Sequence, residues 1–236
     1  MIGLDFSGLL HGSALWYLNR ATGLIDLVLF TAVVVMGIVA TSRRSPSWWP
    51  RFATVSLHRS LSLLAVALLA VHIGAAVVDS YVNIRWLDVI VPFAGSYRPF
   101  WLGLGTVAFD LFLAVAVTSL LRFRIGPKAW RAVHLLAYGA WPVAVVHGLG
   151  TGTDASTLPV LALTFGCVAA VVVAAAWRVS TIQATLPTRL ALLAVVLLLP
   201  LWLAGWVRIG PLQPQWSQQA SASLITSTST TTGGSR

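Results

Sequence analysis

Four histidines stand in two long apolar stretches of this sequence with a regular spacing. His58 and His72 are 14 residues apart, and His134 and His147 are 13 residues apart. If both stretches are helical, the two imidazoles of each stretch lie about 20 Å apart along the helix axis. A neutral imidazole is a common axial ligand of heme iron, and helix bundles hold cofactors between side chains of facing helices. The spacing therefore fits two hemes stacked one above the other between two helices.

The pairing follows if the two helices run in the same direction. His58 and His134 then share the inner depth and His72 and His147 the outer depth, so each heme iron has two protein ligands. Zinc or copper would require three or four ligands within a few ångströms. A hydrogen bond to a neighbouring helix is the alternative for any single histidine. Four costly intramembrane groups at matched depths favour heme, while His11 lies outside the pattern.

The spacing of the second pair is the less regular one. At about 100° per residue, 14 residues return a side chain to within roughly 40° of its starting direction, whereas 13 leave it about 140° away. Pro142 lies between His134 and His147. A proline inside a helix removes a hydrogen bond and kinks the helix, so we expect it to help re-aim His147.

The elements that must position these histidines are membrane-spanning helices. The 236 residues are 58% hydrophobic and 9% charged, whereas soluble domains carry about 25% charged residues, so a soluble globular domain is excluded. A span requires about 20 apolar residues. The gaps between charges predict an all-α fold, a six-helix transmembrane bundle binding two stacked hemes, within residues 1–212. The predicted spans are 16–40, 54–78, 100–121, 129–150, 157–177 and 190–207.

The two ends of the chain differ in character: the first is apolar and the last is polar. The first apolar stretch is long enough to span and lacks a basic segment before it, so we expect a retained helix and not a signal peptide. Residues 213–236 are rich in Ser, Thr and Gln and have too little apolar surface to order themselves, which predicts a disordered tail.

Basic residues concentrate in alternate loops. By the positive-inside rule those loops are cytoplasmic, both termini are external, and the protein is a multi-pass protein of the plasma membrane. The lipid bilayer is then the expected partner of the protein. The net charge of +9 is explained by this topology, without a nucleic-acid partner. The residues concerned are Arg43, Arg44, Arg51, Arg122, Arg124, Lys128, Arg131, Arg178 and Arg189.

Composition limits the other chemistry. All six acidic residues are Asp, which disfavours paired-carboxylate catalysis, and the single Cys167 cannot form an intrachain disulfide, a zinc ribbon or an iron–sulfur cluster. Asp26 and Asp110 lie inside spans, where we expect them to be protonated or paired across helices; charge balance during heme reduction is the other role open to them. Tryptophans near the span ends are expected to be interfacial anchors. No catalytic residue is predicted.

Beyond the histidines, several segments of the sequence resemble a known family. It is similar to the ferric reductase-like transmembrane domain family, which includes the heme-bearing parts of ferric reductases and NADPH oxidases and the heme subunit of a bacterial methionine sulfoxide reductase. The resemblance covers roughly residues 14 to 210 and implies two heme b groups that carry electrons across the membrane. It rests on the two His pairs, LHRSLSLLAVALLAVH, KAWRAVHLLAYGAWPVAVVHGLGTGTD, WYLNRATG and PFAGSYRPFWLGLG.

The sequence departs from this family in two ways. In the oxidases the histidines lie on the third and fifth helices, whereas here they lie on the second and fourth, with the direction of both helices preserved. The flavin and NADPH domains of the full-length enzymes have no counterpart, since no GxGxxG follows a strand. A separate flavin-containing donor or acceptor protein is therefore expected. Ferric ion, dioxygen, a quinone or a periplasmic protein could each be the final acceptor.

Cationic side chains near the histidines are candidates to bind the heme propionates. For the inner heme these are Arg59 and Arg131, and for the outer heme Arg20 and Arg98, with Tyr97 beside Arg98. The alternative for the inner two is that they extend to lipid headgroups as membrane anchors. The alternative for Arg20, Arg98 and Tyr97 is that they contact a docking partner.

The loop between the second and third predicted spans is expected to cover the outer heme. The segment VNIRWLDVIVPF, between Asp79 and Arg98, is expected to form a short interfacial helix over the outer heme and to control its access to solvent. The function predicted is transmembrane electron transfer from a cytoplasmic or membrane donor to an external acceptor. A heme-free proton or ion channel or transporter that uses the histidines and Asp110, and a heme-stabilised scaffold or sensor, are the alternatives.

Overall fold

The computed structural model describes residues 13–41, 50–79, 84–213 and 215–216. Every regular element in these ranges is an α-helix. The helices are α1 (Ser13–Ala40), α2 (Arg51–Val78), α3 (Trp86–Ile90), α4 (Pro99–Leu120), α5 (Arg122–Ile125), α6 (Pro127–His134), α7 (Ala137–Thr151), α8 (Leu158–Thr181) and α9 (Leu186–Ile209). His11 and residues 217–236 of the expected tail lie outside the described residues.

Six helical segments in the described part of the chain are long and apolar enough to cross a membrane. They are Ala14–Ala40, Phe52–Val78, Pro99–Leu120, Pro127–Thr151, Leu158–Thr181 and Leu186–Ile209. This confirms the predicted six-helix membrane bundle, with most span ends displaced by only a few residues. Prolines mark several of the starts, because the first turn of a helix has no intrahelical partner for the missing N–H: α4, α6, α8 and α9 each have Pro in that turn.

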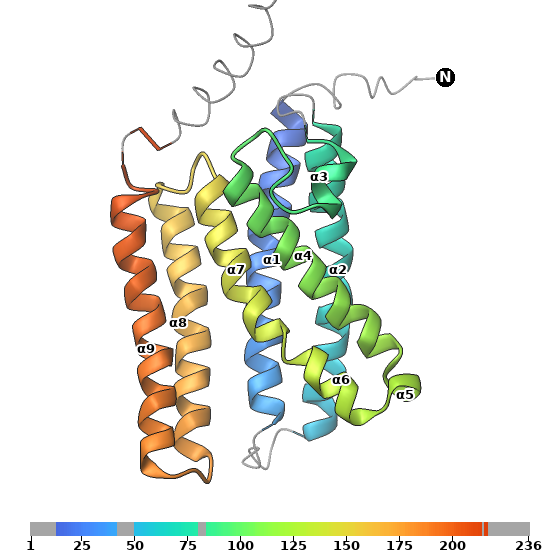
Figure 1. The fold of residues 1–236 in the computed structure, drawn as a ribbon, viewed down its shortest axis with the longest axis vertical. Coiled ribbons are helices and arrows are strands. Elements are labelled where there is room, and N and C mark those ends of the chain that lie inside the picture. The colour runs from blue at the N-terminus through green and yellow to red at the C-terminus, as the bar shows by residue number, and fades with distance from the viewer. Residues whose placement is uncertain (1–12, 42–49, 80–83, 214, 217–236) are drawn as a thin grey trace, which may run out of the picture.

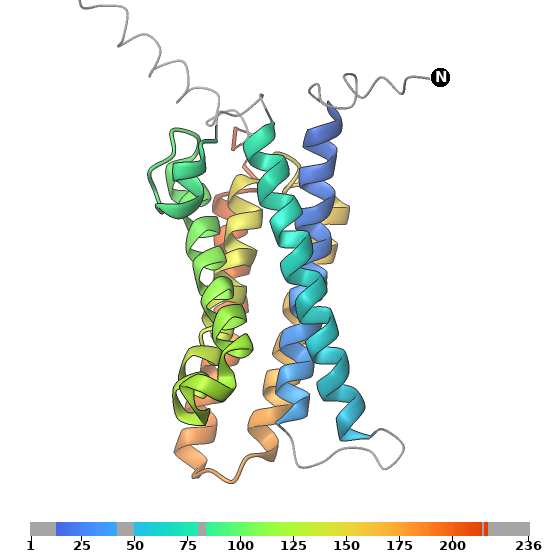
Figure 2. The same ribbon diagram turned by 90° about the vertical axis from the view of Figure 1, so that its right-hand side faces the viewer.

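The helices are arranged so that α1 lies at the centre of the bundle (Figure 1). It packs against α2, α7 and α8, while α4 packs against α7, and α9 against α8. Figure 2 shows α2 beside α1, with α4 and α6 on the opposite side of the molecule. Within the described ranges α2 makes no extended contact with α4, α6 or α7. The two histidine-bearing segments therefore face each other without close packing between their backbones.

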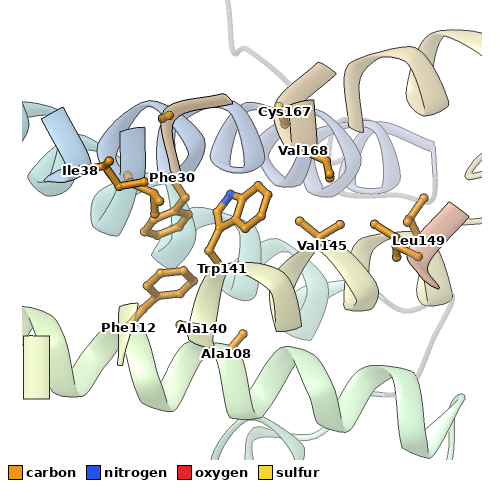
Figure 3. Packing of buried hydrophobic residues seen from close by; sticks show 14 of the residues in the cluster. Phe30, Ile38, Ala108, Phe112, Ala140, Trp141, Val145, Leu149, Cys167 and Val168 are labelled. Carbon is orange, nitrogen blue, oxygen red and sulfur yellow. The ribbon is translucent and has the colours of Figure 1, made fainter. Parts of the chain in front are cut away.

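The apolar core runs along the inside of the bundle, from Ile38 of α1 to Leu149 of α7. Phe30 of α1 and Phe112 of α4 stack with their ring centres 4.0 Å apart, and Trp141 of α7 lies beside them (Figure 3). The indole N–H of Trp141 donates to the hydroxyl of Thr31 at 3.0 Å, so the polar atom of this buried ring has a partner. The aromatic group fixes α1, α4 and α7 relative to one another.

The fourth span is broken into α6 and α7 at Leu135 and Leu136. Hydrogen bonds of the i to i−3 type tighten the chain here, from Leu136 to Val133 at 2.9 Å and from Tyr138 to Leu135 at 3.1 Å. Each residue of such a turn rotates the chain by about 120°, which is roughly 20° more than an α-helix, and this closes part of the angular gap between His134 and His147. The break precedes Pro142, which lies inside α7.

Candidate functional site

The inner pair consists of His58 on α2 and His134 at the end of α6. Their ring centres lie 6.2 Å apart, and the ring planes are inclined by 67°. A bond from a metal to an imidazole nitrogen is about 2.0 Å long, and the ring centre lies about 1 Å farther, so two imidazoles on opposite sides of one ion have their centres about 6 Å apart. The separation of this pair fits axial ligation of a single iron.

The outer pair consists of His72 on α2 and His147 on α7. Both side chains line one cavity of about 170 Å³, whose walls come from α1, α2, α3, α4, α7 and α8. Phe30, Phe112 and Trp141, the aromatic residues of the core, also line this cavity. The wall is mainly apolar, as suits a porphyrin ring, and a few polar side chains interrupt it.

Three of the four imidazoles bind a backbone carbonyl through Nδ1. His58 is 3.1 Å from the carbonyl oxygen of Val33, and His72 is 2.9 Å from that of Asn19. His147 is 2.8 Å from the carbonyl oxygen of Trp101. A carbonyl can only accept, so Nδ1 carries the proton and the lone pair is on Nε2. This is the tautomer in which a histidine can bind a metal through Nε2.

His134 has a different partner. Its Nδ1 is 3.5 Å from the hydroxyl oxygen of Ser119, which also receives a hydrogen bond from the indole of Trp130 at 3.4 Å. The Trp130 ring lies 4.9 Å from the His134 ring, centre to centre. Since a hydroxyl can donate or accept, this contact fixes the tautomer less firmly than a carbonyl does.

Arg20 is the predicted propionate partner that the structure brings to the outer cavity. Its guanidinium forms an ion pair of 2.5 Å with Asp154, and it lines the cavity together with His72 and His147. Its Nη2 is the atom that pairs with Asp154, while its Nε is buried and has no hydrogen-bond partner. Buried donors without acceptors are costly, so a ligand with acceptor oxygens would stabilise this site.

Arg98 has other partners. It starts α4 in a left-handed conformation with φ of 39°, and it is 8% exposed. Its two terminal nitrogens donate to the carbonyl oxygens of Gly150 and Trp216, both at 2.6 Å. Trp216 also packs on Trp101, with ring centres 5.5 Å apart. Arg98 thus ties the start of α4 to the end of α7 and to the chain beyond α9.

The remaining predicted side chains fall into two groups. Arg59 and Arg131 are exposed on the helices that carry the inner pair, and Asp110 is exposed on α4. Asp26 is 4% exposed, lines the outer cavity, and has no hydrogen-bond partner for either carboxylate oxygen. Tyr97 is half-buried next to Arg98.

The short helix expected between Asp79 and Arg98 is α3. Its Asp88 is 3% exposed and lines the outer cavity, while Trp86 and Ile90 are exposed on the other side of the helix. Arg85 donates to the Asp88 carboxylate from its backbone N–H at 3.0 Å and from its guanidinium at 2.8 Å. These bonds lower the pKa of Asp88 below its usual range. The threonine hydroxyl of Thr106 donates to the Asp88 carbonyl at 2.8 Å, which holds α3 against α4.

Comparison with protein families decides the identity of the chain. The family described as ferric reductase like transmembrane component matches residues 22–145, which is more than half of the 236 residues. The chain belongs to this family. Comparison with curated proteins and comparison with solved structures each returned no match.

Membership in the ferric reductase-like family confirms the resemblance drawn from the sequence. The match includes His58, His72 and His134 and ends two residues before His147. The family is generally heme-binding, so this chain is a multi-pass membrane protein with a role in membrane redox chemistry. Among the described residues no three His, Cys, Asp or Glu side chains gather as a site for a bare metal ion. Heme iron takes only two ligands from the protein.

Sequence reasoning missed the groups that orient the histidines. The partners of three rings are backbone carbonyls, of Val33, Asn19 and Trp101, which carry no signal in residue type. The fourth partner, Ser119, is one hydroxyl among many in the sequence.

Proposed function

We propose that this protein carries electrons across the membrane through two b-type hemes, the outer one held by His72 and His147 and the inner one by His58 and His134. The observation that carries the proposal is the inner pair, whose ring centres are 6.2 Å apart, as two axial ligands of one iron require. The Nδ1 contacts support both pairs, because they leave Nε2 of each carbonyl-bonded ring as the ligand atom.

The residues around the outer pair fit a heme. Arg20 lines the cavity with a guanidinium whose buried Nε has no hydrogen-bond partner, and heme propionates have the acceptor oxygens to satisfy it. Arg59 and Arg131 are proposed for the propionates of the inner heme. Arg98 has the weakest support as a heme contact, because two of its nitrogens already donate to carbonyls. Heme iron with two histidine ligands takes up and releases one electron, and the protein sets its potential through ligand basicity, burial and charge.

The direction of transfer is part of the proposal. The start of α1 and the end of α9 lie at one end of the bundle (Figure 1), where α2 and α7, which carry His72 and His147 near their C-terminal ends, also end. At the other end lie α5, α6, the end of α8 and the start of α9, which carry Arg122, Arg124, Lys128, Arg131, Arg178 and Arg189. The positive-inside rule assigns that end to the cytoplasm and both termini to the outside of the plasma membrane. Electrons then enter near His58 and His134 from a separate flavin-containing protein and leave near His72 and His147. The acceptor is ferric ion, dioxygen, a quinone or a periplasmic protein.

Heme content tests the first half of the proposal. Protein purified with its lipids should contain two heme b per chain by the pyridine hemochrome assay, and it should show split low-spin bands after reduction with dithionite. His72→Ala should lower the content to one. A featureless spectrum would overturn the proposal and favour the heme-free channel or transporter, while loss of neither heme in His72→Ala would overturn the pairing.

Vectorial transfer tests the second half. Proteoliposomes with dithionite trapped inside should reduce an impermeant ferric complex added outside, and the rate should fall to that of protein-free liposomes in His72→Ala. Only molecules whose basic loops face the lumen contribute, so orientation is scored by protease protection. Two normal hemes without any reduction outside would instead indicate a heme-stabilised sensor.

A further inference from the structure

Three of the four imidazole rings lie against a glycine of a neighbouring helix. A Cβ atom added to Gly105 would lie 2.6 Å from Nδ1 of His147, and one added to Gly23 would lie 2.9 Å from Cε1 of His72. At Gly37 the nearest atom is Cε1 of His58, at 3.5 Å. Contacts under 3.0 Å are not tolerated by real Cβ atoms, whereas 3.5 Å is ordinary packing. The two outer rings therefore occupy the space that a side chain would fill.

Each glycine stands in a fixed relation to the carbonyl that the ring binds. The carbonyls belong to Trp101, Asn19 and Val33, and each lies four residues before its glycine, which is Gly105, Gly23 or Gly37. In a helix the carbonyl of residue i accepts the N–H of residue i+4, so the side chain at i+4 stands directly beside that carbonyl. A carbonyl oxygen has a second lone pair. A glycine at i+4 exposes that lone pair to an approaching imidazole N–H.

The arrangement repeats along α1 and α2. Gly23 and Gly37 are 14 residues apart on α1, as His72 and His58 are on the antiparallel α2. The two ring-to-glycine contacts are therefore in the same register, four helical turns apart. This repetition is a consequence of one antiparallel packing of two helices, and it accounts for the 14-residue histidine spacing.

His134 shows what happens where no glycine is present. Counting from the contact of Gly105 with His147 on the neighbouring antiparallel helix, the position equivalent for His134 is Thr118. The carbonyl four residues earlier, that of Ala114, already accepts the Thr118 hydroxyl at 2.6 Å. The His134 ring lies instead 3.5 Å from the hydroxyl of Ser119. Both the free space and the free lone pair are missing at this position.

We propose that Gly105 and Gly23 are positioning residues for the heme ligands, and that each acts by opening a backbone carbonyl to Nδ1 of the outer histidine. The inference rests on the proposed heme function and extends it. Such a bond holds the ring in one orientation, keeps the proton on Nδ1, and makes Nε2 a stronger electron donor to iron. Gly37 provides the same carbonyl to His58 but leaves more room.

Replacing each of the three glycines with alanine should disturb heme binding to different extents. At Gly105 the added methyl meets a ring that is rigid and held by the backbone, so the ring must move and its bond to Trp101 is lost. Gly105→Ala should contain one heme per chain, and Gly23→Ala should lose the outer heme or retain it with a raised potential, because a less basic ligand stabilises ferric iron less. Gly37→Ala should keep both hemes and their potentials.

Matched controls come from glycines without neighbours. Gly166 on α8 and Gly205 on α9 have nothing within 4 Å of an added Cβ, and both lie inside apolar spans. Ala is favoured over Gly in helices, so these variants should fold at least as well as the original chain, with two hemes and unchanged spectra. The readouts are heme per chain, the redox titration of each heme, and the EPR spectrum of the ferric protein.

The outcomes separate the inference from the function on which it rests. An original chain that binds no heme would defeat the proposed function. An original chain with two hemes, together with Gly105→Ala and Gly23→Ala that keep two hemes at unchanged potentials, would overturn the positioning role alone. If Gly105→Ala loses both hemes and does not fold, Gly23→Ala tests the positioning role instead, because its added methyl requires a smaller shift of the ring. A Gly23→Ala variant that keeps the inner heme and either loses the outer heme or binds it at a higher potential supports the role. Any other result contradicts it.

Discussion

The outer pair, His72 and His147, and the inner pair, His58 and His134, come from the same two regions of the sequence but are held differently. Both outer rings bind backbone carbonyls at 2.9 and 2.8 Å, and both line one cavity. In the inner pair only His58 has a carbonyl partner, at 3.1 Å. Backbone carbonyls within helices cannot rotate away, so the outer ligands are fixed before any cofactor binds.

His134 is the least constrained of the four. It is the last residue of α6, directly before the tightened turn, and its Nδ1 contact is a hydroxyl at 3.5 Å. Leu135, the next residue, is 56% exposed. A ring at a helix end with a rotatable partner can adjust its position more easily than one inside a packed helix. The contrast indicates a rigid outer site and an adaptable inner site within one bundle.

The largest expected consequence is in heme affinity. Removing one contact that orients a metal ligand typically costs 10–100-fold in affinity, so the outer site should bind heme about 10–100-fold more tightly than the inner one. His58→Ala leaves only the outer pair and His72→Ala leaves only the inner pair. Each apoprotein is titrated with hemin in lipid nanodiscs, and the absorbance of the low-spin product gives the two dissociation constants.

The contrast between a rigid outer site and an adaptable inner site is wrong if the two heme dissociation constants agree within a factor of two, or if the inner site binds heme more tightly. The matched control is His134→Ala, which should reproduce the titration of His58→Ala, because both leave the outer pair intact. A further check replaces the partner hydroxyl: Ser119→Ala should weaken only the inner site.

The second prediction concerns charge, and its effect is smaller. Arg20 is a partly buried cation beside the outer pair, whereas Arg59 is exposed beside the inner pair. A positive charge favours the reduced heme, and a unit charge near 10 Å in an environment of dielectric constant about 20 contributes on the order of 1–2 kcal/mol. Arg20→Gln should therefore lower the potential of the outer heme by roughly 40–80 mV, at about 59 mV per tenfold change for one electron.

Arg59→Gln is the comparison variant, and it should shift the inner potential by much less, since solvent screens an exposed charge. Because Arg20 pairs with Asp154, the double variant Arg20→Gln with Asp154→Asn shows how much of the shift comes from the acid left unpaired. Both potentials are read from one redox titration followed at the heme absorption bands. Equal shifts in the two single variants would show that Arg20 does not contact the outer heme.

Much of the fold could be predicted from the sequence, because membrane spans depend on length and apolarity. The six spans follow from the gaps between charged residues, and the prolines that start α4, α6, α8 and α9 sharpen their limits. The division of the fourth span at Leu135 and Leu136 could not be predicted. Neither residue disfavours a helix, and Pro142, which does, lies inside α7. The tightened turn adds rotation between His134 and His147 and so reduces the angle between the two side chains.

The candidate site could be predicted only in part. The histidines can be recognised in the sequence because ionisable groups are costly in apolar segments. Arg20 can be recognised because it stands near the start of the first predicted span. Their partners depend on three-dimensional register: nothing in sequence distance links Arg20 to Asp154, or His147 to Trp101. For Arg98 the residue type and position suggest a heme contact, but in the structure its two terminal nitrogens donate to backbone carbonyls. The equal spacing of Gly23 and Gly37 was a usable signal for the histidine contacts.

The smallest expected effect concerns α3, which lines the outer cavity and has no counterpart among the described residues at the inner pair. Arg85 lowers the pKa of Asp88 from its usual value near 3.8, so the ionised carboxylate favours the closed helix. A carboxylate with a lowered pKa contributes its full stabilisation above the pKa of the open form and loses it as the pH falls through the lower pKa of the closed form. The contribution is therefore constant from pH 7 to about 5, begins to fall as the pH approaches about 4, and is lost only below the pKa of the closed form.

Asp88→Asn should remove this dependence, at a cost of at most about 1 kcal/mol in the local opening of α3, which is the usual contribution of a helix cap. Hydrogen exchange of the α3 amides, corrected for the intrinsic rates at each pH, measures the opening free energy. The original chain should lose protection between pH 5 and pH 3, and Asp88→Asn should be equally protected at both. Arg85→Gln should show a shallower loss, because Asp88 still accepts the backbone N–H of residue 85. A pH-independent opening in the original chain would mean that the Arg85 to Asp88 contact does not hold α3 over the outer pair, and would leave that role to the Thr106 bond and the packing of α3 on α4.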